Sequence, residues 1–346
     1  MLLSLLAAMS GGIPLVVGLG AGLLLTGFTL PPTARRYLLQ RLRFVCVTLF
    51  VTMGLVWILV HNYRDDSRLD DAGIAPALRR YGDWIGGLVS GEMGQSQYSE
   101  TVGEGIARSL PISFQLLLYS QIIAVALAVP LALIGAQTRG RLGDCSARAI
   151  GLLGLSLPVF MIGPLLVQLF GLGEFNLFGA EIGWRLFPVV LYTPLGDGLG
   201  AHLASMALPT LTLAFSTAAV YSVLLRSEML QQLRSDHVLL ARSKGLAPSR
   251  IVRVHALRPA SPAAIAAIAA QSGLVLGNMV IVERIFSLPG FGDYVLVAIG
   301  RRDELAVVGA IFVAAAILAV VNLLADAALL VVDPRIEGRA LERGDR

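Results

Sequence analysis

Seven long runs of the 346-residue chain contain almost no charged residues, and they limit the possible folds more than any other feature. They cover residues 2–30, 44–61, 112–135, 149–171, 203–225, 259–282 and 305–332, and only the last holds an acid. A helix needs about 20 apolar residues to cross a bilayer, and each run approaches or exceeds that length. Only 14% of the residues are charged, against about 25% in soluble domains. The sequence therefore predicts an all-α, polytopic membrane protein.

Arginine is concentrated in alternate connections between these runs. Residues 34–43, 136–148, 226–258 and 333–346 hold most of the 27 lysine and arginine residues. Loops rich in these residues stay in the cytoplasm, so all four segments, the C-terminus included, are predicted to be cytoplasmic. Because topology explains the basic residues, we expect no nucleic-acid partner.

Residues 1–33 are predicted to form an extra N-terminal transmembrane segment. They lack the positively charged start and the small-residue cleavage site of a signal peptide, and Arg35 and Arg36 follow directly. We interpret them as an uncleaved span with its N-terminus outside, followed by one membrane domain at 34–346. A misassigned start codon is the alternative.

Several kinds of chemistry are missing from the sequence. Lys244 is the only lysine, and Gly245 follows it instead of the serine or threonine of a phosphate-binding loop. The chain has no Gly-x-Ser-x-Gly nucleophile elbow and no His, Cys or carboxylate cluster with metal-ligand spacing. We therefore predict that the chain is not an enzyme, binds no cofactor, and relies on partner subunits for any ATP hydrolysis.

A polar pair in the last run bears on the class of transporter. Asp326 follows Asn322 by four residues, so both lie on one face of a helix. Ion-coupled transporters bury such acids as relay points. We interpret the pair as hydrogen-bonded inside the helix bundle, with a relay or substrate contact as the alternative.

The basic segment between the fifth and sixth runs is interrupted by a glycine and a proline. We predict a helix over 226–244, ended by Gly245 with a positive φ, and a second helix that begins at Pro248. The residues expected on its apolar face are Ile251, Val254, Ala256 and Leu257. A short helix of this kind, between two spans, is a form that docks in a partner's groove, although a membrane-surface helix has a similar pattern.

This loop resembles the EAA-type coupling motif of permease subunits of binding-protein-dependent ABC importers, in the dipeptide, oligopeptide and nickel branch. The matching residues are Asp236, Ala241, Arg242, Lys244, Gly245 and Leu246, then His255, Ala256, Leu257, Arg258 and Ala260. The loop departs from the motif at Leu239 and Leu240, which replace polar residues, at Ala247, where a serine cap is common, and at Pro259, which replaces an asparagine.

Other segments are similar to the same family. They are WIGGLVSGEMGQS (84–96), GLLGLSLPVF (151–160), ERIFSLPGFG (283–292), RRD (301–303) and VNLLADAALLVVDPRI (321–336). We expect Trp84, Ile85 and Leu88 of the first segment to lie at the membrane interface. The Pro-Gly-Asp-Pro element that usually follows the family's first core span is absent from the sequence.

The resemblance implies a six-helix ABC importer permease core in a bacterial inner membrane, plus the extra N-terminal helix. It implies a second permease subunit, two ATP-binding subunits and an external solute-binding protein as partners. The chain would form half of a peptide pathway, and loop 226–258 would couple closure of the ATPases to alternating access. The implied coupling residues are Asp236, Ala241, Arg242, Lys244, Gly245, Leu246, Arg250, His255 and Arg258. Nickel or a metal–chelator complex is the alternative cargo, and a self-sufficient secondary transporter is the alternative class.

Overall fold

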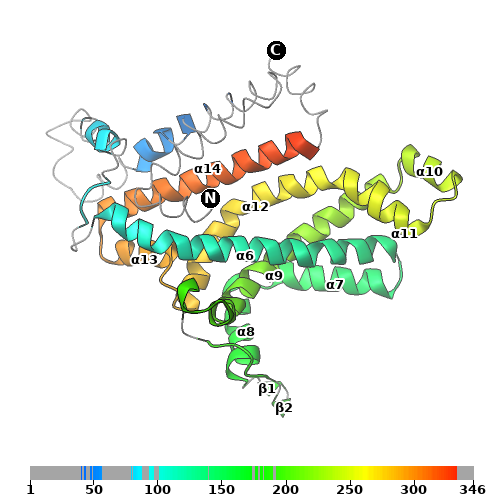
Figure 1. Cartoon of the computed structure of the whole chain (residues 1–346), viewed down its shortest axis with the longest axis horizontal. Coiled ribbons are helices and arrows are strands. Elements are labelled where there is room, and N and C mark those ends of the chain that lie inside the picture. Colours follow the sequence, from blue (N-terminus) through cyan, green and yellow to red (C-terminus); the bar gives the residue numbers. More distant parts are fainter. Residues whose placement is uncertain are drawn as a thin grey trace. The chain divides into compact units, whose positions relative to one another are not determined.

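The computed structural model is helical, with a short hairpin as the one sheet among the residues it describes (Figure 1). It describes residues 40, 43, 47–48, 50–56, 79, 81–87, 93–96, 101–138, 140–173, 176–177, 180–181, 183–189 and 192–332. The elements from residue 102 onward are α6 (Val102–Gln137), α7 (Leu142–Ser156), α8 (Val159–Leu166), the π-helix η3 (Val167–Leu172), β1 (Asn176–Leu177), β2 (Ala180–Glu181), the 3₁₀ helix η4 (Leu195–Asp197), α9 (Leu199–Gln232), α10 (Asp236–Ser243), α11 (Pro248–Arg250), the π-helix η5 (Ile251–Ala256), α12 (Leu257–Ile285), α13 (Phe291–Gly300) and α14 (Glu304–Val332). The antiparallel hairpin β1–β2 has two residues in each strand.

Four helices among the described residues are long and apolar enough to cross a membrane. They are Val102–Gln137, Leu199–Gln232, Pro248–Ile285 and Glu304–Leu329. These helices account for the third, fifth, sixth and seventh apolar runs, so the predicted all-α, polytopic class is confirmed.

Most of the two N-terminal runs lies outside the described residues. Residues 2–30 lie outside the described part of the chain, and so does the proposed extra span at 1–33. Of the run at 44–61, residues 47–48 and 50–56 are described, and their backbone is helical.

The fourth run, 149–171, which the sequence predicts as a span, is broken by a sharp bend. Helices Leu142–Ser156 and Val159–Leu172 meet at an angle of 106°. Pro158 causes the break, because proline disfavours helical backbone at the residue before it. Leu157 accordingly takes extended angles, with φ −91° and ψ 117°, and Pro158 caps the start of α8.

The chain divides into two compact units. The first joins the N-terminal part up to Ser113 with residues 289–330, and the second is centred on Phe114–Leu288. The predicted coupling loop lies in the second unit, and the polar pair Asn322 and Asp326 lies in the first.

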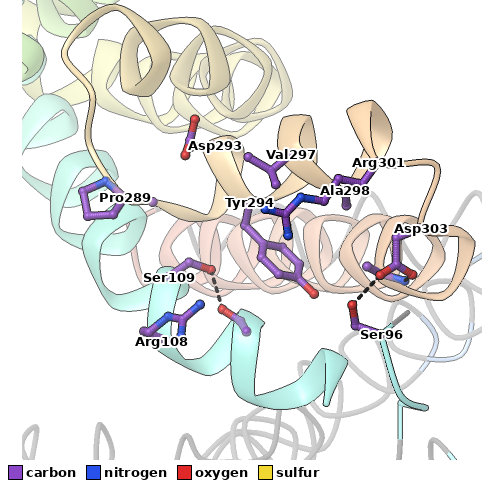
Figure 2. A pocket seen from close by; sticks show the side chains of 13 residues that line it. Ser96, Arg108, Ser109, Pro289, Asp293, Tyr294, Val297, Ala298, Arg301 and Asp303 are labelled. Carbon is purple, nitrogen blue, oxygen red and sulfur yellow. Dashed lines mark hydrogen bonds between the residues drawn. The ribbon is translucent and has the colours of Figure 1, made fainter. Parts of the chain in front are cut away.

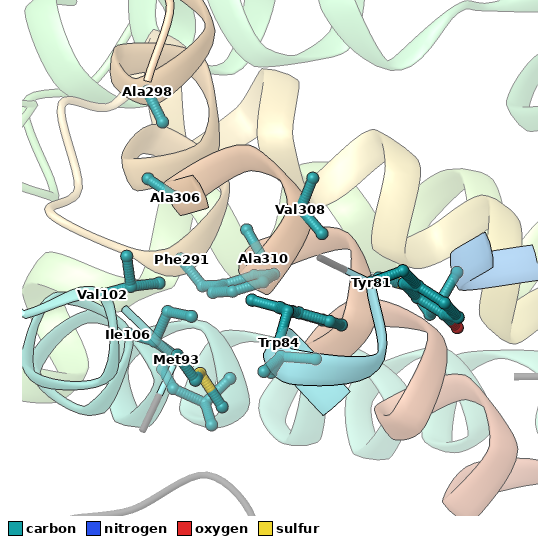
Figure 3. Close-up of a cluster of buried hydrophobic side chains, with 13 residues drawn as sticks. Tyr81, Trp84, Met93, Val102, Ile106, Phe291, Ala298, Ala306, Val308 and Ala310 are labelled. Carbon is teal, nitrogen blue, oxygen red and sulfur yellow. The ribbon is translucent and has the colours of Figure 1, made fainter. Parts of the chain in front are cut away.

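An aromatic side chain anchors the core of the first unit (Figure 3). Trp84 is 8% exposed, and its ring packs edge-on against Phe312 of α14, with centroids 6.3 Å apart. The indole therefore has apolar partners within the protein, and its expected position at the membrane interface stays a prediction. Ile85 packs at the edge of the same core, and Leu88 lies outside the described residues. Other members of this core are Met53, Met93, Val102, Ile106, Phe291 and Val308.

Small residues let the helices of the second unit approach closely. Helix α9 packs against α7 and α12, and Ala124, Ala128, Ala214, Ala218 and Ala267 form one of the buried clusters. Close backbone approach through small side chains is how helices associate in a bilayer. This packing places α10 and α11 together at one end of α9 and α12 (Figure 1).

Candidate functional site

The bend of the predicted coupling loop is a complete helix-stop motif at Gly245. This residue has a φ of +75°, and its N–H donates to the carbonyl of Arg242 at 2.9 Å. The N–H of Leu246 donates to the carbonyl of Ala241 at 3.3 Å. These two bonds form the Schellman arrangement, which satisfies carbonyls at the end of α10. The predicted glycine stop is confirmed.

The second half of the loop starts where the sequence predicts. Ala247 takes extended angles at the cap position, and Pro248 occupies the first turn of α11. The carbonyl of Ala247 accepts bonds from the N–H groups of Arg250 and Ile251 at 2.9 and 3.1 Å. Proline is favoured here because its fixed φ suits a helix and its missing N–H has no intrahelical role.

A small apolar core beneath the bend fixes the angle between the two halves. Val238, Ala241 and Ile251 are buried, and Leu233 and Leu246 pack against them. The contact of Leu246 with this core is the hydrophobic contact that accompanies a Schellman stop. Burying a side chain such as valine or isoleucine contributes about 1.5–3 kcal/mol, so this core holds the bend together.

Two local predictions about the loop were wrong. The helix expected over 226–244 is interrupted, because α9 ends at Gln232 and α10 begins at Asp236. On the second helix Val254 is 47% exposed. Val252 is buried instead, because it packs in a cluster with Leu225 and Met229 of α9. Since residues 226–232 belong to α9, the projecting part of the loop is shorter than predicted.

The outer surface of the loop combines cations with two exposed leucines. Arg242, Lys244, Arg250 and Arg258 are exposed, as is Asp236, while His255 is half-buried. Leu239 and Leu240 on α10 are 66% and 58% exposed. The exposed residues of the loop therefore offer a partner both apolar and positively charged side chains.

Pro259, which stands where the family motif has an asparagine, leaves a carbonyl that a histidine on the other half of the loop contacts. In an α-helix the N–H of residue 259 would bond to the carbonyl of His255, but proline has no N–H. The imidazole Nε2 of His237 lies 3.2 Å from that carbonyl oxygen and supplies a donor in its place. The π-helical segment η5 directly precedes the proline. This contact joins α10 to the start of the following span.

We expect Pro259→Ala to make His237 dispensable. His237→Ala should cost about 0.5–1.5 kcal/mol of local stability in the parent chain, the usual net contribution of a hydrogen bond. The cost should be smaller in the Pro259→Ala background, because the alanine N–H can bond to the His255 carbonyl. Amide hydrogen exchange over residues 250–258 measures both costs. His255→Ala is the control, because the contact uses the main chain of residue 255, and equal costs of His237→Ala in both backgrounds would contradict the prediction.

Three of the sequence motifs meet around one polar pocket in the first unit (Figure 2). The pocket has a volume of about 240 Å³ and is lined by Ser96, by Pro289 and Gly290, and by Arg301 and Asp303. The hydroxyl of Ser96 donates to Asp303 at 2.5 Å. The other carboxylate oxygen of Asp303 accepts from the N–H of Ala306 at 3.2 Å. Asp303 therefore caps α14 and joins two motifs that lie far apart in the sequence.

The polar pair of the last span lies on α14. Asn322 and Asp326 are both half-buried there, and they belong to the first unit, whereas the loop residues belong to the second. Their role stays a prediction. No group of three His, Cys, Asp or Glu side chains that could hold a metal ion occurs in the part of the chain that the structure describes.

One buried ionic contact was missed by sequence reasoning. The Asp144 side chain is 1% exposed and contacts Arg226, which lies near the end of α9. The i,i+4 spacing of Asp144 and Arg148 signals a pair on one helix. Nothing local in the sequence signals the contact with Arg226, because that residue is 82 positions away.

Comparison with known proteins identifies the family. Residues 128–338 match the family described as "Binding-protein-dependent transport system inner membrane component". The matched segment contains α10, η5, α12 and α14, so it includes both the bent loop and the last span. The chain belongs to this family. The permease is therefore a multi-pass inner-membrane subunit of a binding-protein-dependent ABC importer, as its sequence resemblance implied.

Its relatives have similar lengths. The permease is 33% identical to the di/tripeptide transport system permease protein DppB of Pseudomonas aeruginosa over 273 residues, which is 75% of this chain and 81% of the relative. It is 28% identical to the dipeptide transport system permease protein DppB of Bacillus subtilis, over 87% of this chain and 98% of the relative. The corresponding DppB of Escherichia coli K12 is 31% identical, with 75% and 81% covered.

Proposed function

We propose that the permease forms half of a peptide pathway and that loop 226–258 couples that pathway to ATP-binding subunits. Di- and tripeptides are the proposed cargo, since the names of the similar permeases specify them. A second permease subunit would complete the pathway, and an external solute-binding protein would deliver the peptide. The arginine distribution supports a cytoplasmic position for the loop and the C-terminus.

The observation that carries the coupling proposal is the rigid bend at Gly245. The Schellman bonds and the apolar core fix the angle between α10 and η5. A fixed angle is what a loop needs to transmit movement, because a flexible connector would absorb it. The bend also presents Leu239 and Leu240 on an exposed surface with Arg242 nearby. The complementary surface on an ATP-binding subunit is a groove with an apolar floor and acidic edges.

Transport by the purified complex, reconstituted in liposomes, tests this function. We expect labelled dipeptide uptake to require the solute-binding protein and ATP on the side of the coupling loop. Uptake should persist when an ionophore collapses the proton gradient. The permease without ATP-binding subunits should hydrolyse no ATP, because its one lysine lies outside a phosphate-binding loop.

Two outcomes would contradict the proposal in different ways. Proton-driven uptake by the permease alone would make it a secondary transporter. Accumulation of a nickel–chelator complex with no uptake of peptides would keep the coupling mechanism and replace the proposed cargo. A catalytically inactive ATP-binding subunit in the same liposomes is the control for ATP dependence.

A further inference from the structure

Three donors bind a buried carboxylate close to the base of the coupling loop. The side chain of Asp144, on the first turn of α7, accepts from Arg226 Nη2 at 2.5 Å and from Arg148 Nη2 at 2.7 Å. The N–H of Gly140 also donates to it, at 3.0 Å. The carboxylate is 1% exposed, and the Arg226 side chain is 19% exposed. Charges this well buried are costly to separate, because neither one recovers its full hydration.

Of these donors, only Arg226 joins different helices. Gly140 and Arg148 lie within four residues of Asp144, so their bonds stabilise the start of α7. Arg226 comes from α9, and its side chain lies against Gly135 of α6. A β-carbon at residue 135 would lie 2.8 Å from Arg226 Cδ, so the glycine leaves room for the arginine. Ends of α6, α7 and α9 therefore meet at one ionic contact.

The same stretch of α9 supports the base of the coupling loop. Leu225 and Met229, on either side of Arg226, belong to a buried cluster with Val252 and Ala256 of η5. Residues Ala132 and Ala136 of α6 and Ala260 of α12 complete this cluster. A displacement of η5 therefore presses on the part of α9 that carries Arg226.

We propose that the Arg226–Asp144 pair is a positioning link that transmits movement of the coupling loop to α7. Because the buried carboxylate keeps its arginine partner, the start of α7 follows the end of α9 when that end moves. Helix α7 leads to the 106° bend and α8, so the movement reaches the broken span. This inference rests on the proposed coupling function of the loop.

Two arginine-to-glutamine variants separate this role from a structural one. Arg226→Gln removes the link between helices but leaves the carboxylate its bonds to Arg148 and Gly140. Arg148→Gln is the matched control, because it removes an ion pair with the same carboxylate and one positive charge from the same side, but only within α7. Free energies of coupling between sites usually correspond to factors of 5–150, so we expect Arg226→Gln to lower peptide uptake per ATP hydrolysed about tenfold. Arg148→Gln should leave this ratio unchanged.

The ratio of uptake to hydrolysis is the deciding measurement, since a loss of folding or assembly lowers both rates together. An unchanged ratio in Arg226→Gln, or an equal fall in both variants, would overturn the inference. If Arg226→Gln does not assemble, Arg226→Met provides the same test, because it also removes the charge that pairs with Asp144 but keeps an unbranched apolar side chain. An unchanged ratio in Arg226→Met would overturn the inference equally. A Gly245→Val complex measured alongside tests the loop itself. Normal transport by Gly245→Val would contradict the proposed coupling function. Loss of transport by Gly245→Val, together with a normal ratio for Arg226→Gln, would contradict only this inference.

Discussion

Gly245→Val is expected to insert into the membrane at nearly normal abundance and to abolish transport. A β-carbon at residue 245 would have no atom within 4 Å, so the obstacle is not a lack of space. The obstacle is the φ of +75°, which a β-branched residue strongly disfavours. Holding valine there costs on the order of 1–3 kcal/mol, which is enough to change the bend but too little to unfold the spans. The altered bend should change the angle between α10 and η5, misplace the exposed Leu239 and Leu240, and weaken binding of the ATP-binding subunits.

Peptide uptake and co-purification of the ATP-binding subunits measure this effect in the assembled complex. Lys244→Ala is the comparison, since it changes the adjacent exposed residue without changing the backbone. A single cation at a helix end contributes about 0.3–1 kcal/mol, so this variant should retain most of its uptake. Normal uptake by Gly245→Val would show that the loop is only a connector.

Gly154→Leu is expected to separate α7 from α9 and to lower the abundance of the folded permease severely. A β-carbon at residue 154 would lie 2.6 Å from Ala219 Cβ and 3.3 Å from the carbonyl oxygen of Phe215. Neither obstacle is the end of a flexible side chain, so the helices themselves must move apart. Overpacking a close interface typically costs about 1–3 kcal/mol, and leucine adds further atoms beyond the clashing β-carbon.

Gly277→Ala is the control for this effect. Gly277 lies inside the span formed by α12, and a β-carbon there would have nothing within 4 Å. We expect Gly277→Ala to leave the thermal midpoint of the detergent-purified permease nearly unchanged, and Gly154→Ala to lower it by a few degrees, the scale of a loss of about 1–2 kcal/mol in a protein of this size. A parental midpoint and abundance for Gly154→Leu would show that α7 and α9 do not pack as described.

The sequence alone predicted the local structure wherever the signal lies within one segment of the chain. Charge-free runs predicted the long helices α6, α9, α12 and α14, because crossing a bilayer depends on the composition of one segment. Gly245 and Pro248 predicted both sides of the bend, because a helix stop and a helix start depend on a few adjacent residues. The Schellman bonds span only six residues, so the local chain contains all the groups that the motif needs.

Short-range patterns did not predict where a helix ends or how sharply it bends when packing between two helices determines these features. The end of α9 at Gln232 allows Val238 and Ala241 to reach Ile251, a contact that the helical pattern of 226–244 does not reveal. The apolar run at 149–171 resembles a span, and Pro158 alone did not reveal how sharply the chain turns between α7 and α8.

Contacts between distant residues required the tertiary structure. Ser96 and Asp303 are 207 positions apart in the sequence and meet at one pocket. Trp84 is buried against Phe312. In the sequence, the i,i+4 spacing pairs Arg148 with Asp144, and Arg226 has the pattern of a topology charge. Only the packing of α7 on α9 brings Arg226 to the same carboxylate, where it joins two separate helices.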